Sequence, residues 1–215
     1  MDNANKSLAP ELSLESVLLD DSFNRGESLV NFTVLFGNTS PVEIEIGTGK
    51  GTFLLERAKA RPDVNFLGIE WTRKYCFHAA DRIRRWNLSN VRMLRIDAAI
   101  FFRQRVSNNS LQRVHIYFPD PWPKTKHCKR RLIQPAFVGA LHAKLRIGGQ
   151  IIIITDHAEY ACQIAWVIFS ERGFASVPFS RILGAEGGKL VGTNFERKYI
   201  AQGRTFFSLA VMKWR

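Results

Sequence analysis

The 215-residue chain contains only three cysteines, Cys76, Cys128 and Cys162, and no two of them form a CxxC pair. This spacing argues against a disulfide framework and against a metal site, and it favours reduced thiols in a cytoplasmic protein. Long apolar runs are also missing, since the stretches 151–154 and 164–169 fall far short of the roughly 20 residues that span a bilayer. The first ten residues lack the charged-then-apolar pattern of a signal sequence. We therefore expect a soluble, cytoplasmic protein with no membrane partner.

Acidic residues are scarce relative to basic ones, with 19 Asp and Glu against 31 Lys and Arg and a formal net charge of +12. An excess of this size causes self-repulsion unless a polyanion relieves it, and the phosphate backbone of a nucleic acid is the usual polyanion. A generally solvated basic surface is the alternative. A membrane surface is disfavoured because no basic amphipathic helix with a clean apolar face is found.

Apolar runs alternate with helical patterns along most of the chain. Strands are expected at residues 41–46, 65–70, 91–96, 113–118 and 150–155. Helices are expected at 27–36, 52–60, 73–86, 98–105, 131–145 and 157–172. Residues 1–25 are expected to form a flexible arm, and the tail from 174 to form β-structure interrupted by a loop at 184–203. This order predicts one α/β domain over residues 1–215, with a doubly wound, mostly parallel sheet, helices on both faces and antiparallel strands at the C-terminal end.

The first predicted strand runs into a glycine-rich turn, Glu45-Ile-Gly47-Thr-Gly49-Lys-Gly51. Glycines let the backbone approach a ligand closely and turn sharply into a helix N-terminus. A dinucleotide fingerprint would need the spacing GxGxxG, but Thr52 occupies the last glycine position and the pattern is GxGxG. This pattern with a preceding acid is typical of S-adenosylmethionine sites, because a carboxylate suits an ammonium group and disfavours a pyrophosphate. A plain turn between strand and helix is the alternative.

Glu70 and Asp97 follow the next two predicted strands, so a doubly wound sheet brings them to the same edge as Glu45. Glu70 can accept hydrogen bonds from both hydroxyls of a ribose, or be an exposed acid at a strand end. Asp97 can accept from the adenine amino group or cap the following helix, and both roles can coexist. Three acids after three consecutive strands favour a cofactor site, and we predict that Glu45, Gly47, Gly49, Glu70 and Asp97 bind S-adenosylmethionine.

The fourth predicted strand ends in the loop Phe118-Pro-Asp120-Pro-Trp-Pro123. Prolines fix φ and stiffen the loop, so Asp120 is expected to be held at the mouth of the site. A basic run follows from Lys124 to Arg131 and could grip phosphates. Without its neighbours such a run is more often only a solvated face.

The segment Phe118-Pro-Asp-Pro-Trp-Pro-Lys124, followed by His127-Cys-Lys-Arg-Arg131, resembles the signature of the bacterial tRNA (guanine-N7)-methyltransferase family. The resemblance continues in Arg131-Leu-Ile-Gln-Pro135-Ala-Phe137, Thr155-Asp156 and Thr193-Asn-Phe-Glu196, and it covers nearly the whole chain after about residue 30. It implies a Rossmann-like class I methyltransferase that uses S-adenosylmethionine and binds tRNA. The implied target is N7 of the guanine at position 46 in the variable loop of tRNA.

The resemblance also implies roles for single residues. Asp120 matches the active-site aspartate of the family, and the resemblance implies that it also lies beside the cofactor as one of the cofactor-binding residues. The substrate-contacting positions that it implies are Lys124, Asp156, Thr193, Asn194, Phe195 and Glu196. Because N7 of guanine carries no proton, methyl transfer needs no obligatory base, and alignment and electrostatics can supply the catalysis.

Two other functions remain as alternatives at this stage. One is an S-adenosylmethionine-dependent RNA methyltransferase with a different target, although the order Asp-Pro-Trp fits the pattern of amine-methylating enzymes poorly. The other is a non-catalytic RNA-binding protein of the same fold, which would be expected to lose the cofactor acids. The sequence is compatible with either a monomer or a homodimer.

Overall fold

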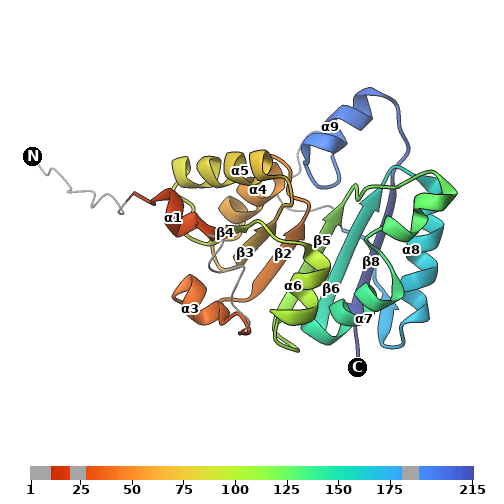
Figure 1. The fold of residues 1–215 in the computed structure, drawn as a ribbon, viewed down its shortest axis with the longest axis horizontal. Helices are drawn as coiled ribbons and strands as arrows, with labels where there is room; N and C mark the ends of the chain where they lie inside the picture. Colours follow the sequence, from red (N-terminus) through yellow and green to blue (C-terminus); the bar gives the residue numbers. More distant parts are fainter. Residues whose placement is uncertain (1–10, 20–27, 181–188) are drawn as a thin grey trace, which may run out of the picture.

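The computed structural model describes residues 11–19, 28–180 and 189–215. Within them, eight strands form one sheet in the order β1-β4-β3-β2-β5-β6-β8-β7 (Figure 1). The strands are β1 (Leu18–Leu19), β2 (Val42–Ile46), β3 (Asn65–Ile69), β4 (Val91–Leu94), β5 (Leu111–Tyr117), β6 (Leu145–Thr155), β7 (Phe174–Ser176) and β8 (Phe207–Lys213). Strands β1 to β6 pair in parallel, while β8 pairs antiparallel with β6 and β7. The mostly parallel sheet and its antiparallel C-terminal strands confirm the predicted fold class.

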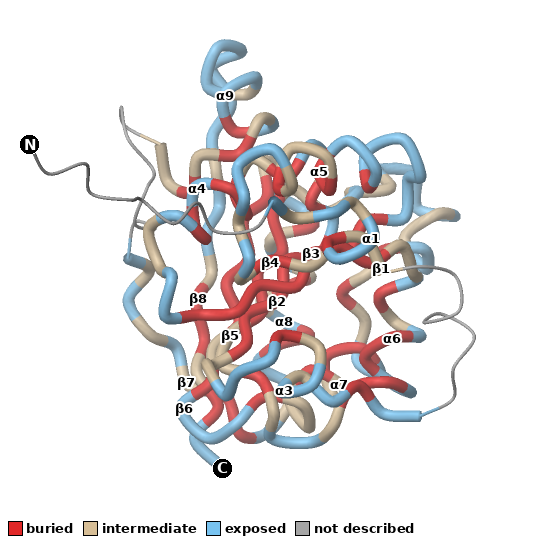
Figure 2. Tube along the Cα trace, turned by 90° about the vertical axis from the view of Figure 1, so that its left-hand side faces the viewer, coloured by how far each residue is buried: buried red, intermediate tan, exposed pale blue. Residues whose placement is uncertain are grey.

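Helices cover both faces of the sheet. They are α1 (Leu14–Val17), α3 (Phe32–Phe36), α4 (Thr52–Ala60), α5 (Arg73–Arg85), α6 (Ala98–Gln104), α7 (Pro135–Lys144), α8 (Ala158–Ser170), α9 (Asn194–Ala201) and the 3-10 helix η1 (Thr125–Arg130). Alternation along the strands creates two cores: Ile151 and Ile153 of β6 pack with α6, α7 and α8, while Ile152 and Ile154 pack with α4 and α5. Figure 2 shows the buried strands between these layers and α9 exposed beyond them. No helix in the described ranges is long and apolar enough to cross a membrane.

In the middle of the chain, the two largest errors in the predicted boundaries are at the starts of α7 and β6. Helix α7 begins at Pro135 instead of residue 131, because proline has no N–H to continue a helix and forces Gln134 into an extended conformation. Strand β6 begins at Leu145 and continues through Gly148 and Gly149, which were expected to separate it from the helix. Gly149 lies against neighbouring carbonyl oxygens so closely that a Cβ would clash there, and the strand therefore accommodates a glycine.

Differences also occur near both ends. The expected loop at 184–203 contains helix α9 in its described part. Part of the expected arm is ordered against the sheet, since α1 buries Val17 and β1 pairs with β4. Of the helix expected at 27–36, residues 28–31 are described and are not helical, and the five-residue α3, capped by Asn31, follows them. Residues 1–10 and 20–27 of the predicted arm and helix lie outside the described residues.

Candidate active site

The carboxyl ends of the parallel strands meet at one edge of the sheet, and α9 lies beyond this edge (Figure 1). A cavity of about 320 Å³ opens there, between the turn after β2 and the start of α9. Its described lining consists of Glu45, Gly47, Thr48, Gly49, Lys50, Thr52, Phe53, Tyr75, Tyr117, Thr193, Asn194, Phe195 and Lys198. The cavity thus joins the predicted glycine-rich turn to three of the four residues predicted in the 193–196 segment.

The glycine-rich turn takes a conformation that L side chains rarely adopt. Gly47 has φ 77° and Gly49 has φ 53°, and a Cβ atom built on Gly47 would meet no atom within 4 Å. The Gly47 amide donates to the carbonyl of Ile69 at 2.8 Å, which ties the turn to β3. The backbone is therefore bare on the cavity side, as close contact with a ligand requires.

Glu45 is the buried acid of this cavity. Its side chain is 2% exposed, and its Oε2 atom has no hydrogen-bond partner among the described residues. Burial, reinforced by the negative charge of Glu70, raises the pKa of Glu45 well above its ordinary value. A buried and unpaired carboxylate is costly unless a cationic ligand pairs with it. The buried Glu45 carboxylate, as a hydrogen-bond acceptor, therefore fits the ammonium group of S-adenosylmethionine.

The other two predicted cofactor acids, Glu70 and Asp97, accept hydrogen bonds from backbone amides in this structure. Glu70 accepts hydrogen bonds from the amides of Gly49 and Thr72, each at 2.8 Å, so it joins the glycine-rich turn to the start of α5. Asp97 is the N-cap of α6 and accepts from the Ile100 amide at 2.9 Å. Neither residue is part of the described lining of the cavity. Both still have carboxylate lone pairs that can accept from a ligand.

Asp120 lies in the exposed loop that follows β5. Arg131, which is 3% exposed, holds this loop: its Nε donates to the Pro121 carbonyl at 2.7 Å. The same guanidinium reaches α8, where it pairs with Glu159 at 3.0 Å and donates to Gln163 at 2.5 Å. The loop position is therefore fixed by a buried cation as well as by its prolines.

Helix α9 is held above the cavity by its own capping contacts. Thr193 is the N-cap and accepts from the Glu196 amide at 3.0 Å. The buried Glu196 carboxylate accepts from the preceding amides of Leu190, Val191 and Gly192. The Thr193 bond is one half of a capping box, and Glu196 instead accepts from the three amides before Thr193, so both side chains organise the segment that carries Phe195.

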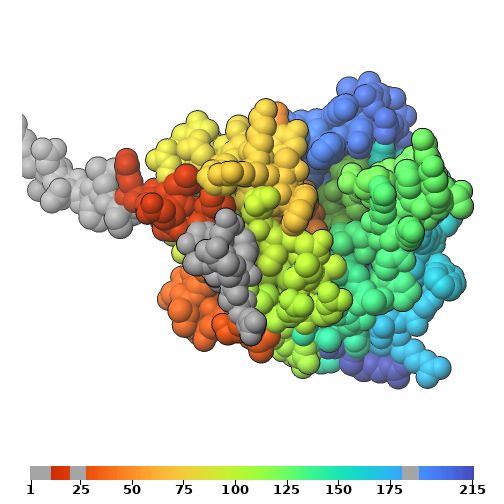
Figure 3. Space-filling model, viewed as in Figure 1, coloured from red at the N-terminus to blue at the C-terminus, as the bar shows by residue number. Residues whose placement is uncertain are grey.

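The remaining predicted substrate positions differ in their surroundings. Asn194 and Phe195 line the cavity, with Phe195 near the backbone of Gly49. Asp156 follows β6 and forms an ion pair with Arg204. Lys124 is exposed and precedes η1, beyond the cavity. The loop at Phe118 approaches α9 through a ring contact with Tyr199 at 5.4 Å, and Figure 3 shows α9 and segment 119–131 side by side.

Sequence reasoning did not identify three aromatic residues of the cavity, Phe53, Tyr75 and Tyr117. Tyr117 directly precedes the recognised Phe118 motif, and it was assigned to a strand with no role of its own. Its available signal was alternation, since residues 43 and 45 of one strand and 115 and 117 of another are polar positions in otherwise apolar runs.

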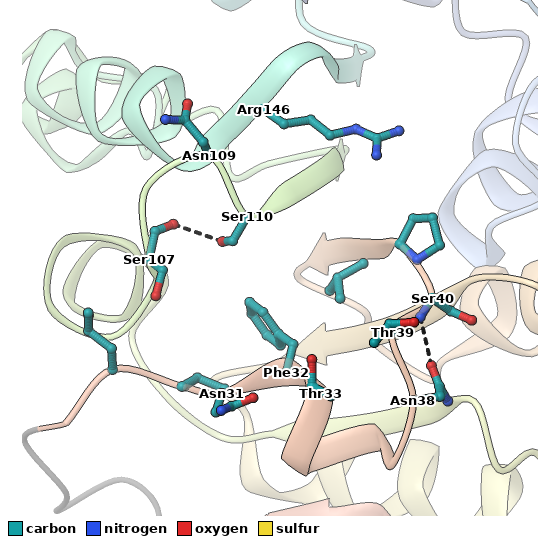
Figure 4. A pocket seen from close by; sticks show the side chains of 14 residues that line it. Asn31, Phe32, Thr33, Asn38, Thr39, Ser40, Ser107, Asn109, Ser110 and Arg146 are labelled. Carbon is teal, nitrogen blue, oxygen red and sulfur yellow. Dashed lines mark hydrogen bonds between the residues drawn. The ribbon is translucent and has the colours of Figure 1, made fainter.

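A larger cavity, of about 590 Å³, lies at the opposite edge of the sheet (Figure 4). Its lining is mostly polar and includes Asn31, Ser107 and Arg146, near the amino ends of strands β2, β5 and β6. The acids that follow the strands do not contribute to its described lining. Ligands of doubly wound sheets bind at the carboxyl ends of the strands, so the smaller cavity is the candidate site.

Known proteins that resemble this chain are methyltransferases. The family described as "Putative methyltransferase" matches residues 39–209. An aminoglycoside resistance methyltransferase, NpmB1, superposes with a TM-score of 0.59 at 14% identity over 86% of this chain and 94% of its own. A SAM-dependent methyltransferase from Aquifex aeolicus gives a TM-score of 0.53 at 12% identity over 85% and 88%. The fold is that of the class I S-adenosylmethionine-dependent methyltransferases.

Sequence relatives define the family more closely. The tRNA (guanine-N(7)-)-methyltransferase of Buchnera aphidicola subsp. Baizongia pistaciae is 36% identical over 91% of this chain and 81% of its own length. The protein of the same name from Nitrosomonas europaea is 35% identical over 93% and 88%. The chain belongs to the tRNA (guanine-N(7)-)-methyltransferase family.

Proposed function

We propose that this protein transfers a methyl group from S-adenosylmethionine to N7 of a guanine in tRNA, with position 46 of the variable loop as the target. The observation that carries the proposal is the unpartnered Glu45 carboxylate in a glycine-walled cavity at the carboxyl edge of the sheet. The names of the sequence relatives supply the substrate and the atom. A cytoplasmic location belongs to the same proposal, because the sparse, unpaired cysteines suit a reducing compartment.

The cofactor supplies an electrophilic methyl group on a sulfonium sulfur. In this proposal Glu45 binds its ammonium group, and Gly47 and Gly49 offer bare backbone for close contact. Glu70 and Asp97, which already order the turn and helix α6, accept from the ribose hydroxyls and from the adenine amino group. Four of these five residues follow strands β2, β3 and β4, so the parallel sheet brings them to one edge.

Asp120 acts on the guanine in this mechanism. A new N–C bond forms from the N7 lone pair as the methyl–sulfur bond breaks, and the sulfur keeps the bonding electrons. No proton is removed from N7, so the protein needs to align the base rather than to activate it. Asp120 orients the guanine by accepting from its N1–H or its amino group, and it stabilises the positive charge that develops on the base.

The RNA is gripped around this point by basic residues. Guanine N7 faces the deep major groove of an RNA helix, so the base must be splayed or the helix distorted before transfer. Lys124 holds a phosphate at the entry to η1, where Lys126, Lys129 and Arg130 are also exposed. Asp156 recognises the Watson–Crick edge of the base, which requires it to exchange its partner Arg204. Phe195 and Asn194 close the site from α9.

Labelled S-adenosylmethionine and unmodified tRNA test the proposal directly. We expect labelled 7-methylguanosine after digestion, located at position 46, and its loss with Asp120→Asn while S-adenosylhomocysteine still binds. The matched control is Asp63→Asn, an exposed acid paired with Arg61 away from the cavity. Label on another atom or nucleoside would overturn the target assignment, and full transfer by Asp120→Asn would overturn the role of Asp120.

A further inference from the structure

A row of buried polar side chains leads along the sheet to the cofactor cavity. Glu43 on β2 and His115 on β5 are both 0% exposed, and Tyr117 on β5 is 5% exposed. Glu43 Oε2 lies 2.8 Å from His115 Nε2, and His115 Nδ1 lies 2.6 Å from the Tyr117 hydroxyl. Phe53 of α4 packs against both rings, with centroid distances of 4.8 and 4.9 Å. The row begins at the buried Glu43 and ends at Tyr117, which lines the cavity.

The charges around Glu43 fix the direction of the first hydrogen bond. Arg57 Nε lies 3.6 Å from Glu43 Oε2, and Arg113 Nη1 lies 3.5 Å from Glu43 Oε1. Glu43 is therefore an ionised carboxylate and only accepts hydrogen bonds. His115 Nε2 must then carry the hydrogen and donate it. Two guanidinium groups already face one carboxylate, and a further positive charge on buried His115 would be unfavourable. The imidazole is therefore neutral, and its Nδ1 is an acceptor.

The second hydrogen bond follows from the first. Since Nδ1 of His115 accepts, the Tyr117 hydroxyl donates its only hydrogen to it. Burial lowers the pKa of His115 in spite of its bond to Glu43, and burial together with the charges of Glu45 and Glu43 raises the pKa of Tyr117. Both directions agree with a neutral imidazole and a protonated phenol. The oxygen of Tyr117 is left with lone pairs alone to offer to a further partner, and Tyr117 lines the cavity.

We propose that Tyr117 binds the ammonium group of the cofactor as an obligate hydrogen-bond acceptor beside Glu45, and that Glu43 and His115 are positioning residues that fix this polarity. The inference rests on S-adenosylmethionine as the cofactor of the proposed function. An ammonium group has three donors and can use two acceptors at once. Tyr117 and the unpartnered carboxylate of Glu45 line the same cavity. A hydroxyl that rotated freely could point its hydrogen at the cation, and the bond to His115 prevents this.

A pair of ligands separates this role from a structural one. S-adenosylhomocysteine carries the ammonium group, whereas 5′-methylthioadenosine has the adenosine and thioether without the amino-acid part. In calorimetric titrations, Tyr117→Phe is expected to weaken S-adenosylhomocysteine about tenfold, the usual effect of losing a hydrogen bond to a charged group. Binding of 5′-methylthioadenosine should change less than about twofold. Tyr160→Phe is the matched control, because it removes a buried hydroxyl in the other core, where that hydroxyl accepts from the Ile133 amide at 3.2 Å, and leaves the cavity lining and the row untouched.

Each outcome decides between defined possibilities. Equal weakening of both ligands by Tyr117→Phe, or no weakening of either, would overturn the inference, as would the same selective loss in Tyr160→Phe. Failure of the wild-type protein to bind S-adenosylhomocysteine would instead overturn the cofactor assignment of the proposed function. The two failures are therefore distinguishable in one set of titrations.

The tautomer of His115 tests the positioning residues without any ligand. Nitrogen NMR of the full chain, with the signals identified by their loss in His115→Gln, is expected to show hydrogen on Nε2 and a bare Nδ1 at neutral pH. A hydrogen on Nδ1 would make Tyr117 an acceptor from His115 and overturn the proposal. If Glu43, His115 and Tyr117 served only to pack the core, neither tautomer of His115 would be required.

Discussion

Glu43 and Glu45 lie two residues apart on the same face of β2, and their pKa values move in opposite directions. Burial alone would raise the pKa of Glu43, but the hydrogen bond from His115 and the charges of Arg113 and Arg57 lower it to about 2. Glu45 has no such partners, and burial raises its pKa well above the ordinary value. Strand β2 therefore carries one carboxylate, Glu43, whose charge is balanced by groups of the protein. It carries a second, Glu45, whose charge only a bound cation would balance.

The first prediction concerns the cost of keeping Glu45 unpaired. Its pKa in the folded chain is above the value of about 4.5 expected when unfolded, so the folded state loses stability as pH rises above that value. Glu45→Gln should therefore raise the melting temperature at pH 7 and have little effect below about pH 4. With saturating S-adenosylhomocysteine the order should reverse, because the wild type binds the ligand more tightly and gains more stability from it.

The melting temperatures of the wild type and Glu45→Gln, measured with and without S-adenosylhomocysteine, test this prediction. Glu56→Gln is the control, since Glu56 lies exposed on α4 and should leave both melting temperatures unchanged. A Glu45→Gln protein that is less stable than wild type at pH 7 would show that the carboxylate is already compensated in the unliganded protein.

The second prediction has the opposite sign of pH dependence. The pKa of Glu43 is lowered from 4.5 to about 2, so its stabilisation is present above pH 4.5 and is lost as pH falls toward 2. The gap between these values corresponds to about 3 kcal/mol of unfolding free energy. Glu43→Gln should lose about this amount at pH 7 and converge with wild type near pH 2. Denaturant unfolding over this pH range checks it, and a difference that stays constant with pH would contradict it.

Much of the fold could be predicted because its signals are local. Helix α4 has the predicted bounds, and β2, β3 and α5 differ from prediction by a single residue at one end. Helix α9 was missed although Thr193 and Glu196 form a capping-box spacing, because the glycines and charges around them favoured a loop.

The candidate site was only partly predictable for a different reason. Glu45 and the glycine-rich turn adjoin each other in sequence, so their pattern is visible in one segment. The pairing of Glu43 with His115 spans 72 positions and depends on the register between β2 and β5. A single sequence does not specify that register, and the role of Tyr117 follows from it.

The third prediction separates positioning of the Asp120 loop from binding of RNA. Arg131→Lys keeps the charge but loses the fork that joins the Pro121 carbonyl to Glu159 and Gln163. Turnover with tRNA should fall about tenfold, because a displaced Asp120 no longer aligns the base, while S-adenosylhomocysteine affinity stays unchanged.

Arg130→Ala, a change at the adjacent residue, is the comparison for the loss of turnover expected of Arg131→Lys. Arg130 is exposed and lies over the Trp122 ring at 5.1 Å, so its loss should raise KM for tRNA more than it lowers kcat. If Arg131→Lys also acted only on KM, the loop would not need Arg131 for alignment.

The fourth prediction concerns the segment that closes the cavity. Glu196→Ala removes the acceptor of three amides at 190–192, so these amides should exchange hydrogen faster and Thr193 to Phe195 should lose their fixed position. S-adenosylhomocysteine should bind several-fold more weakly, with little change in the melting temperature of the sheet. Ile200→Ala, an exposed change on the same helix outside the cavity lining, should have neither effect. Faster exchange at 190–192 with unchanged ligand affinity would remove α9 from the cofactor site.

The last prediction tests where the RNA backbone lies. Each phosphate contact releases condensed counterions, so loss of one contact lowers the dependence of log affinity on log salt by about 1. Lys124→Gln and Lys129→Gln should each show this decrease in tRNA binding, because both lysines are exposed next to the Asp120 loop. Lys144→Gln should leave the slope unchanged, since Lys144 ends α7 at the opposite edge of the sheet and contacts Asn108. Equal slopes for all three variants would mean that the excess positive charge acts diffusely, and that η1 does not form the phosphate-binding surface.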